Sequence, residues 1–391
     1  MKASSRSDSI VKWVCFRIAA IGIATLVALL MAELILRIVP VPGGDSYSLV
    51  YDPEMELYKF TPNTTVVRTN VRGERIVRKV NSEGFLDVNH LKRNRNNAYR
   101  IGLFGDSFVE AFQVPLESTF SSLIQDRFPV HKVEIFAFGK SRHGTIHSYL
   151  KSKKYAKYFD LDMVVYVFSE NDLGDQIEGV TNAKTLQSVE LVNKQLVIND
   201  RWLKADREKR MFRAKLRRFF PWDKSVVLTT IRARRELLAR HGIQIKVDER
   251  ARQMATKGDI TKIPVETDLP STWSDAYKRQ GMELGEAVIL KWYQETKLSG
   301  RKFVILYVPR ESEWKKDDIK QDSWKYWLRT YCQKTGIEFI DPTRQFFKYD
   351  RLGKKPYDDH FSEDGHIAFA ECFLDWLKKQ NLERTTCQNS Q

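Results

Sequence analysis

The chain has 391 residues, enough for one large domain or two small ones. Lysine and arginine outnumber aspartate and glutamate, 65 to 50, which gives a formal net charge of +15. This charge favours anionic surroundings such as phospholipid head groups, acidic glycans or nucleic acid. Because neither zinc-finger spacing nor an RNA-binding aromatic signature accompanies it, we expect no nucleic-acid partner.

The first forty residues contain an apolar segment of membrane-spanning length. Residues 18–32, IAAIGIATLVALLMA, carry no charge, and apolar residues continue on both sides, approaching the roughly 20 that cross a bilayer. The basic residues before this run predict a cytoplasmic N-terminus at 1–12, a transmembrane signal anchor at 13–39 and an extracytoplasmic main domain: Lys2, Arg6, Lys12 and Arg17. A cleaved signal peptide and a buried core helix are the alternatives, and the poor cleavage site at 30–32 disfavours the first.

Residues 40–97 are polar and rich in turns, and we expect them to form a membrane-proximal stalk packed onto the main domain. Apolar runs in the remaining chain predict strands at 99–104, 132–138, 162–168, 302–308 and 337–340. Helix-length segments lie near 117–128, 145–158, 273–299, 322–335 and 364–379. This alternation predicts a flavodoxin-like three-layer α/β/α sandwich over 98–380, with a five-stranded parallel sheet. Its ligand site should lie beyond the carboxyl ends of the strands.

A long interruption at about 175–270 separates the third and fourth strands. Within it, residues 201–220 carry nine basic and two acidic residues, and the apolar residues fall at helical spacing. This segment is either an amphipathic lid on a membrane or acidic polymer, or a solvated helix packed on the domain. The last residues, 381–391, are expected to form a flexible tail.

The first strand of the main domain runs directly into Gly105-Asp106-Ser107. A glycine at the end of a strand allows a sharp turn and a close approach of the backbone. Ser107 is therefore either part of a helix N-cap or a nucleophile at a strand-to-helix turn, with backbone N–H groups nearby. If it is a nucleophile, other reactive residues should follow the ends of other strands, and they do.

Asn171 and Asp172 follow the third strand, and Asp358, His360 and the pair Gly365-His366 lie near the C-terminus. In this order, with NSEGF at 81–85, the motifs resemble those of the SGNH/GDSL hydrolase family, specifically its membrane-anchored bacterial members. The resemblance covers about residues 45–380 outside the insertion.

The resemblance implies a role for each of these residues. Ser107 would be the nucleophile and His360 its general base, because a serine hydroxyl needs a base to form an acyl-enzyme. Asp358 would orient the imidazole. Many family members have Asp-x-x-His, but position 357 is Tyr, so Asp358 fits the Asp-x-His version that some relatives use, and Asp359 is the alternative.

The resemblance also implies an oxyanion hole made by the Ser107 backbone N–H, the Asn171 side-chain amide and a third N–H. Arg142 stands where the family has a glycine in its second block, between Gly139 and Gly144. An arginine there keeps the N–H and either narrows the site, attracts an anionic substrate or marks a degraded site. A turn-forming Asn-Asp pair is the alternative for Asn171.

These residues predict a membrane-tethered serine esterase that faces the extracytoplasmic side. It would remove short acyl groups from a carbohydrate or another cell-envelope ester, without cofactor or metal. An O-acyltransferase using the same acyl-enzyme and a non-catalytic glycan-binding scaffold are the alternatives. The small-acyl and glycan parts of this expectation follow from the family resemblance alone.

Overall fold

The computed structural model describes residues 4–38, 47–70, 72–94, 97–176, 187–193, 195–199, 275–315, 324–358 and 360–380, with Phe212, Val227 and Ile231. The rest of the expected basic insertion, the tail at 381–391 and Asp359 lie outside these residues.

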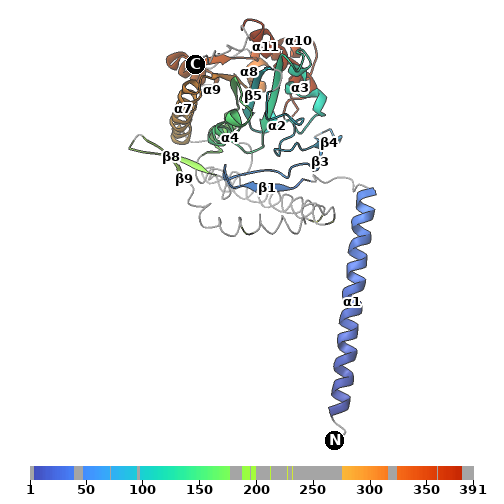
Figure 1. Cartoon of the computed structure of the whole chain (residues 1–391). Helices are drawn as coiled ribbons and strands as arrows, with labels where there is room; N and C mark the ends of the chain where they lie inside the picture. Colours follow the sequence, from blue (N-terminus) through green and yellow to red (C-terminus); the bar gives the residue numbers. More distant parts are fainter. Residues whose placement is uncertain are drawn as a thin grey trace, which may run out of the picture.

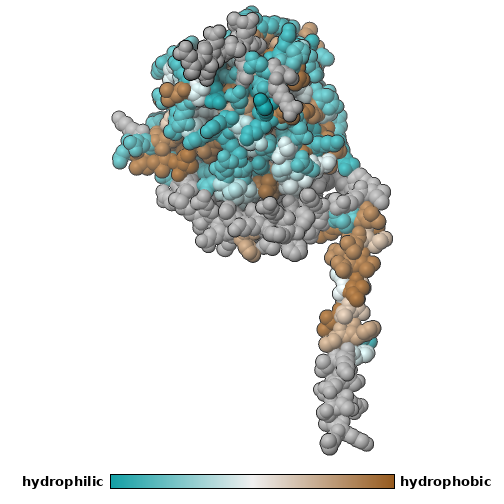
Figure 2. All heavy atoms as spheres, in the orientation of Figure 1, coloured by the Kyte–Doolittle hydropathy of each residue, from teal (hydrophilic) through white to brown (hydrophobic). Residues whose placement is uncertain are grey.

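The N-terminal apolar segment forms one helix, α1 (Ser4–Ile38), which extends away from the rest of the chain (Figure 1). Residues Trp13–Ile35 have a mean hydropathy of 2.4, and none of the 18-residue apolar window within them is buried. Figure 2 shows its apolar surface beside the largely hydrophilic surface of the main domain. The helix is therefore long and apolar enough to cross a membrane.

The main domain is built on a parallel sheet with the strand order β11-β10-β7-β5-β6. Its strands are β5 (Tyr99–Gly105), β6 (Val133–Gly139), β7 (Met163–Phe168), β10 (Lys302–Tyr307) and β11 (Glu338–Ile340). The strand of this sheet that comes first in the sequence, β5, lies between the next two, β6 and β7. This order confirms the predicted flavodoxin-like sheet and places the ends of β5, β6 and β7 side by side.

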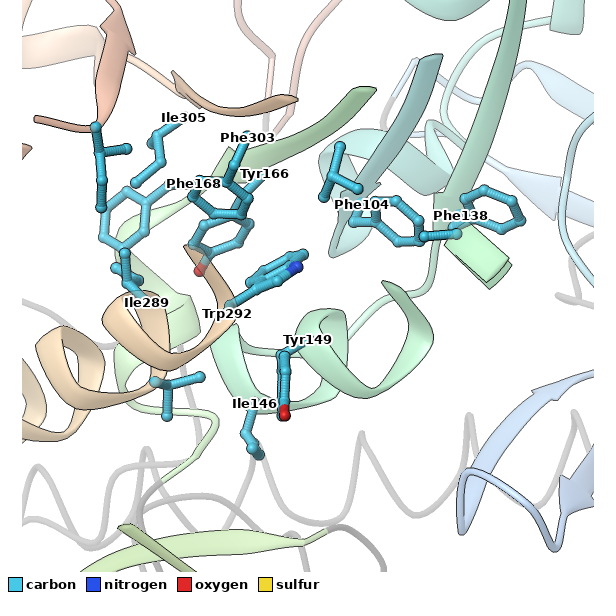
Figure 3. Close-up of a cluster of buried hydrophobic side chains, with 14 of the residues drawn as sticks. Phe104, Phe138, Ile146, Tyr149, Tyr166, Phe168, Ile289, Trp292, Phe303 and Ile305 are labelled. Atoms are coloured by element: carbon cyan, nitrogen blue, oxygen red, sulfur yellow. The ribbon is translucent and has the colours of Figure 1, made fainter. Parts of the chain in front are cut away.

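Helices cover both faces of the sheet, which confirms the three-layer prediction (Figure 1). One face packs against α4 (Thr145–Tyr158), α7 (Asp275–Leu298) and α9 (Trp324–Thr335). The other packs against α3 (Phe120–Gln125), α8 (Glu311–Lys315), α10 (Thr343–Arg351) and α11 (Glu363–Leu377). On the first face, Trp292 of α7 lies against Tyr166 and Phe303, with ring centroids 4.9 and 5.2 Å away (Figure 3).

Short elements complete the described chain. Three antiparallel hairpins are formed by β1 (Leu49–Asp52) and β2 (Leu57–Phe60), by β3 (Thr65–Thr69) and β4 (Arg75–Lys79), and by β8 (Ser188–Val192) and β9 (Gln195–Asn199). The short helices are α2 (Ser107–Glu110), η1 (Leu116–Ser118) and η2 (Glu170–Leu173).

Arg78 on β4 attaches the second hairpin to the main domain. Its buried guanidinium donates hydrogen bonds to the carbonyl oxygens of Ala111 at 3.0 Å, Val114 at 3.1 Å and Leu86 at 2.5 Å. Burial lowers the pKa of Arg78 to about 10, still high enough to keep it charged at neutral pH. The hairpin is thus held against the segment that follows α2.

His90 makes a second attachment, at the β6 edge of the sheet. Its Nδ1 lies 3.0 Å from a carboxylate oxygen of Glu134, and its Nε2 lies 3.0 Å from Asp87. Burial alone would lower the pKa of His90, but Asp87 and Glu134 outweigh that effect and raise it to about 9. The imidazole is therefore protonated at neutral pH and stabilises two buried acids.

We expect Arg78→Met to lower the free energy of unfolding by about 2–4 kcal/mol, because three buried carbonyl groups lose their donor. Urea unfolding of the full chain in detergent measures this change. Arg75→Met, on the exposed side of the same strand, is the matched control and should change stability by less than about 0.5 kcal/mol. Equal effects of the two substitutions would contradict the role given to Arg78.

We expect His90 to make stability depend on pH. Because its pKa is raised in the folded chain, its contribution is complete below the unfolded value of about 6.5 and is lost as pH rises through about 9. The loss is on the order of 3 kcal/mol. Urea unfolding between pH 6 and pH 10 should show this decline in the unmodified chain and in His131→Gln, an exposed control, and a smaller decline in His90→Gln. An identical decline in all three would exclude His90 as its source.

Candidate active site

Ser107 stands at the turn between β5 and α2, beyond the carboxyl end of the sheet. The turn is tight, because a Cβ on Gly105 would lie 2.6 Å from Cγ2 of Val109 and 3.0 Å from the carbonyl oxygen of Val167. Asp106 caps α2 by accepting a hydrogen bond from the Phe108 backbone N–H at 2.9 Å. The capping role therefore belongs to Asp106, which leaves the Ser107 hydroxyl directed elsewhere.

The Ser107 hydroxyl meets the imidazole of His360. Oγ lies 2.8 Å from Nε2, although 253 residues separate the two in sequence. His360 lies in a tight turn. A bridge between Tyr357 and Phe361 closes this turn, and the Asp358 N–H donates a hydrogen bond to the carbonyl oxygen of His360. Its ring packs beside Phe108, with centroids 5.0 Å apart. The 2.8 Å between Oγ of Ser107 and Nε2 of His360 is a distance at which a general base can accept a hydroxyl proton.

Asp358 lies two residues before His360 and is half-buried. Its Oδ2 accepts a hydrogen bond from Nε of Arg72 at 2.6 Å and also contacts another guanidinium nitrogen of Arg72. The hydrogen bond with Asp358 raises the pKa of Arg72. Asp359 lies outside the described residues, and the assignment of Asp358 as the acid that orients His360 stays a prediction.

Asn171 lies in η2, just after β7, and shares a carboxylate with the Ser107 turn. Its Nδ2 donates to Oδ2 of Asp106 at 3.0 Å and to Oδ2 of Asp175 at 3.4 Å, and its Oδ1 accepts from the Ser169 hydroxyl. The Ser107 hydroxyl lies 3.4 Å from the same Asp106 oxygen. The structure therefore brings together the ends of β5 and β7, as the position of the motifs predicted.

Asp106 is completely buried at this junction. Burial raises its pKa, and the Phe108 N–H and the Asn171 amide oppose that rise because both stabilise the carboxylate.

Arg142 lies in the loop between β6 and α4 and adopts the left-handed backbone region, with φ of 67°. Glycine favours this conformation, and here an arginine adopts it. The side chain of Arg142 is exposed. Whether its backbone N–H serves as an oxyanion donor stays a prediction.

Glu110 holds the Arg142 loop against α2. Its carboxylate accepts hydrogen bonds from the Ser141 N–H at 2.7 Å, the Ser141 hydroxyl at 2.8 Å and Nζ of Lys140 at 3.0 Å. Two glycines let the loop pack closely: a Cβ on Gly139 would lie 1.9 Å from the Glu110 nitrogen, and one on Gly144 would lie 2.3 Å from the Asp172 carbonyl oxygen. The loop is thus fitted between the segments that carry Ser107 and Asn171.

Sequence analysis missed three residues that shape this site: Arg72, Glu110 and Lys151. Lys151, on α4, is buried behind the site and donates to the carbonyl oxygens of Gly105 at 2.6 Å and Phe138 at 2.7 Å. Burial lowers its pKa to about 7, against the attraction of Asp172 and Asp106. The available signal for Lys151 was its position on the helix, four residues from both His147 and Tyr155 and therefore on the same face. Arg72 and Glu110 left no such signal.

No family model matches the sequence, and no curated protein matches it. Among solved structures, a member of the lipolytic G-D-S-L family from Veillonella parvula is similar at 12% identity over 72% of this chain and 100% of its own, with a TM-score of 0.38. The α/β hydrolase LAE5 from the Lake Arreo metagenome shows 14% identity, coverage of 73% and 98%, and a TM-score of 0.39. An acetylxylan esterase from Geobacillus stearothermophilus is similar at 12% identity over 75% of this chain and 100% of its own, with a TM-score of 0.37. The function of this chain has to be argued from its own side chains.

We expect Arg142→Gly to unfold with a free energy about 1 kcal/mol higher than Arg142→Ala, since only glycine adopts a positive φ without strain. Urea unfolding of the two variants measures the difference. Both lose the exposed guanidinium, so the loss of side-chain contacts cancels in the comparison. Equal stabilities would mean that the loop relaxes out of the left-handed region.

Proposed function

We propose that this chain is a membrane-tethered serine esterase that removes a short acyl group, such as acetyl, from a carbohydrate or another cell-envelope ester. The observation that carries this proposal is the 2.8 Å contact between the Ser107 hydroxyl and the His360 imidazole at the carboxyl end of the sheet. A serine and a histidine in this contact, on a strand-to-helix turn, form the reacting pair of serine hydrolases.

In the first step, Oγ of Ser107 attacks the ester carbonyl carbon while Nε2 of His360 accepts the hydroxyl proton. The bond from carbon to the alcohol oxygen then breaks, and His360 returns the proton to that oxygen, so the alcohol leaves and the acyl group stays on Ser107. Water repeats the sequence in the second step and releases the carboxylic acid. We assign to Asp358 the orientation of His360.

The negative charge that develops on the carbonyl oxygen needs preorganised donors, and each is worth about 10²–10³ in rate. We assign this role to the backbone N–H groups of Ser107 and Arg142 and to Nδ2 of Asn171. The short hydrogen bond to Asp106, at 3.0 Å, fixes the Asn171 amide, and the longer one to Asp175, at 3.4 Å, is the contact that an oxyanion would replace.

We further propose that α1 anchors the chain as a single pass, with the main domain on the extracytoplasmic side. The support for this orientation is the apolar span Trp13–Ile35 together with the basic residues that precede most of it. A tethered enzyme in this orientation would meet esters of the cell envelope rather than cytoplasmic metabolites.

We expect Ser107→Ala and His360→Ala each to lower kcat/KM for p-nitrophenyl acetate by about 10³-fold or more, because each removes one member of the reacting pair. Release of nitrophenol by the full chain in detergent measures the rates. Ser299→Ala and His131→Ala are the matched controls, since these residues lie outside the site. Equal rates in all variants would leave a non-catalytic glycan-binding protein, and transfer of acetyl to an added glycan instead of water would identify an acyltransferase.

A further inference from the structure

An open pocket of about 410 Å³, including its mouth, lies beside His360. Three segments form it: the turn of the β3–β4 hairpin, the stretch after α2, and Asp358 with residues 360–363 before and within the start of α11. The polar residues among its described walls are Asn70, Arg72, Glu74, Gln113, Asp358, His360, Ser362 and Glu363.

The pocket lies on the side of the site from which the alcohol leaves. In the proposed reaction, His360 returns its proton to the alcohol oxygen, so the alcohol part of the ester must lie within reach of Nε2. The described walls include His360 but neither Asn171 nor Arg142, which are assigned to the carbonyl oxygen. A group held in this pocket would therefore be the alcohol rather than the acyl part of the substrate.

The hairpin wall of the pocket is preformed. Oδ1 of Asn70 accepts hydrogen bonds from the backbone N–H groups of Arg72 at 3.1 Å and Glu74 at 2.9 Å, which fixes the turn. Nδ2 of Asn70 donates to the Gln113 carbonyl oxygen at 3.3 Å, and Arg72 binds Asp358. The turn is thus bonded to both of the other walls, which lowers the ordering cost of binding a ligand there.

The chemistry of the walls matches that of a sugar. Nε2 of Gln113 is a buried donor atom without a hydrogen-bond partner among the described residues, and an unpaired buried donor is costly unless a ligand or water binds it. The carboxylates of Glu74 and Glu363 can accept hydrogen bonds from hydroxyl groups, and Val114 and Pro115 supply apolar contact for C–H groups. Hydroxyl groups, which both donate and accept, fit donors and acceptors set side by side.

The charge of the pocket is opposite to that of the chain. The described walls contain three carboxylates, on Glu74, Asp358 and Glu363, and one guanidinium, on Arg72, so these walls have a formal charge of −2 although the chain has +15. A carboxylate or phosphate on the alcohol would be repelled at this short range, where screening by salt is weakest.

We propose that this pocket binds the sugar that carries the ester, and that it selects neutral sugars over uronic acids and sugar phosphates. The proposal rests on the proposed esterase function and adds to it the identity of the alcohol. The positive charge of the chain as a whole would then interact with anionic surroundings, such as a membrane surface, and not with its substrate.

The test compares three esters on the full chain in detergent: monoacetylated methyl xyloside, monoacetylated methyl glucuronoside and p-nitrophenyl acetate. The two glycosides differ in the carboxylate, and the aryl ester has no sugar. We expect kcat/KM to be about tenfold higher for the xyloside than for the glucuronoside. Glu74→Gln, which keeps the shape and removes one charge, should narrow that preference by about threefold.

Gln113→Leu tests the hydrogen-bonding wall. We expect the ratio of kcat/KM for the acetylated xyloside to that for p-nitrophenyl acetate to fall about fivefold to tenfold, because the aryl ester makes no sugar contacts. Arg75→Ala, on the same hairpin but outside the pocket, is the control and should leave the ratio unchanged. A general loosening of the fold would lower both rates and leave the ratio as it was.

Each outcome has one meaning. A preference for the glucuronoside, no hydrolysis of the xyloside, or an unchanged ratio in Gln113→Leu together with an unchanged preference in Glu74→Gln overturns the pocket assignment. The esterase proposal survives all three results as long as Ser107-dependent release of nitrophenol is observed. Loss of that release overturns the esterase itself.

Discussion

The carboxylate of Asp106 joins the segments that follow β5 and β7, and the geometry of the site depends on it. One of its oxygens accepts from the Phe108 N–H and the other from the Asn171 amide. Since a buried carboxylate is costly unless it is hydrogen-bonded, neither segment can move away without leaving an unpaired acid in the interior. The positions of the Ser107 hydroxyl and the Asn171 amide are therefore set by one shared partner.

Two further buried charges hold the loops around this carboxylate. Lys151 binds the carbonyl groups at the ends of β5 and β6, and Glu110 binds the loop that carries Arg142. These contacts explain how an arginine can keep a positive φ, because the surrounding hydrogen bonds are lost if the loop relaxes. The site thus rests on the ends of the strands, on hydrogen bonds to buried charged side chains and on the Lys140–Glu110 ion pair.

The segment between α1 and β5 contributes to the site. Arg78 and His90 fix it to the main domain, and the turn between β3 and β4 places Arg72 on Asp358, next to His360. A segment that only linked the domain to α1 would need none of these buried contacts. The turn between β3 and β4 therefore forms one wall of the pocket in which we place the sugar.

The sequence determined the five strands of the sheet and the longer helices around it, because helices and buried strands leave periodic and apolar patterns: α4 begins and ends where predicted, and all five strands of the sheet were found. It also indicated Ser107, Asn171 and His360, since each follows a motif at an expected position. Arg72 and Glu110 left no such signal, because a charged residue in a turn or short helix looks the same whether it faces solvent or a partner distant in sequence. Only the tertiary structure decided those contacts, together with the 2.8 Å approach of Ser107 to His360, because parallel strands bring together residues that the chain itself keeps far apart.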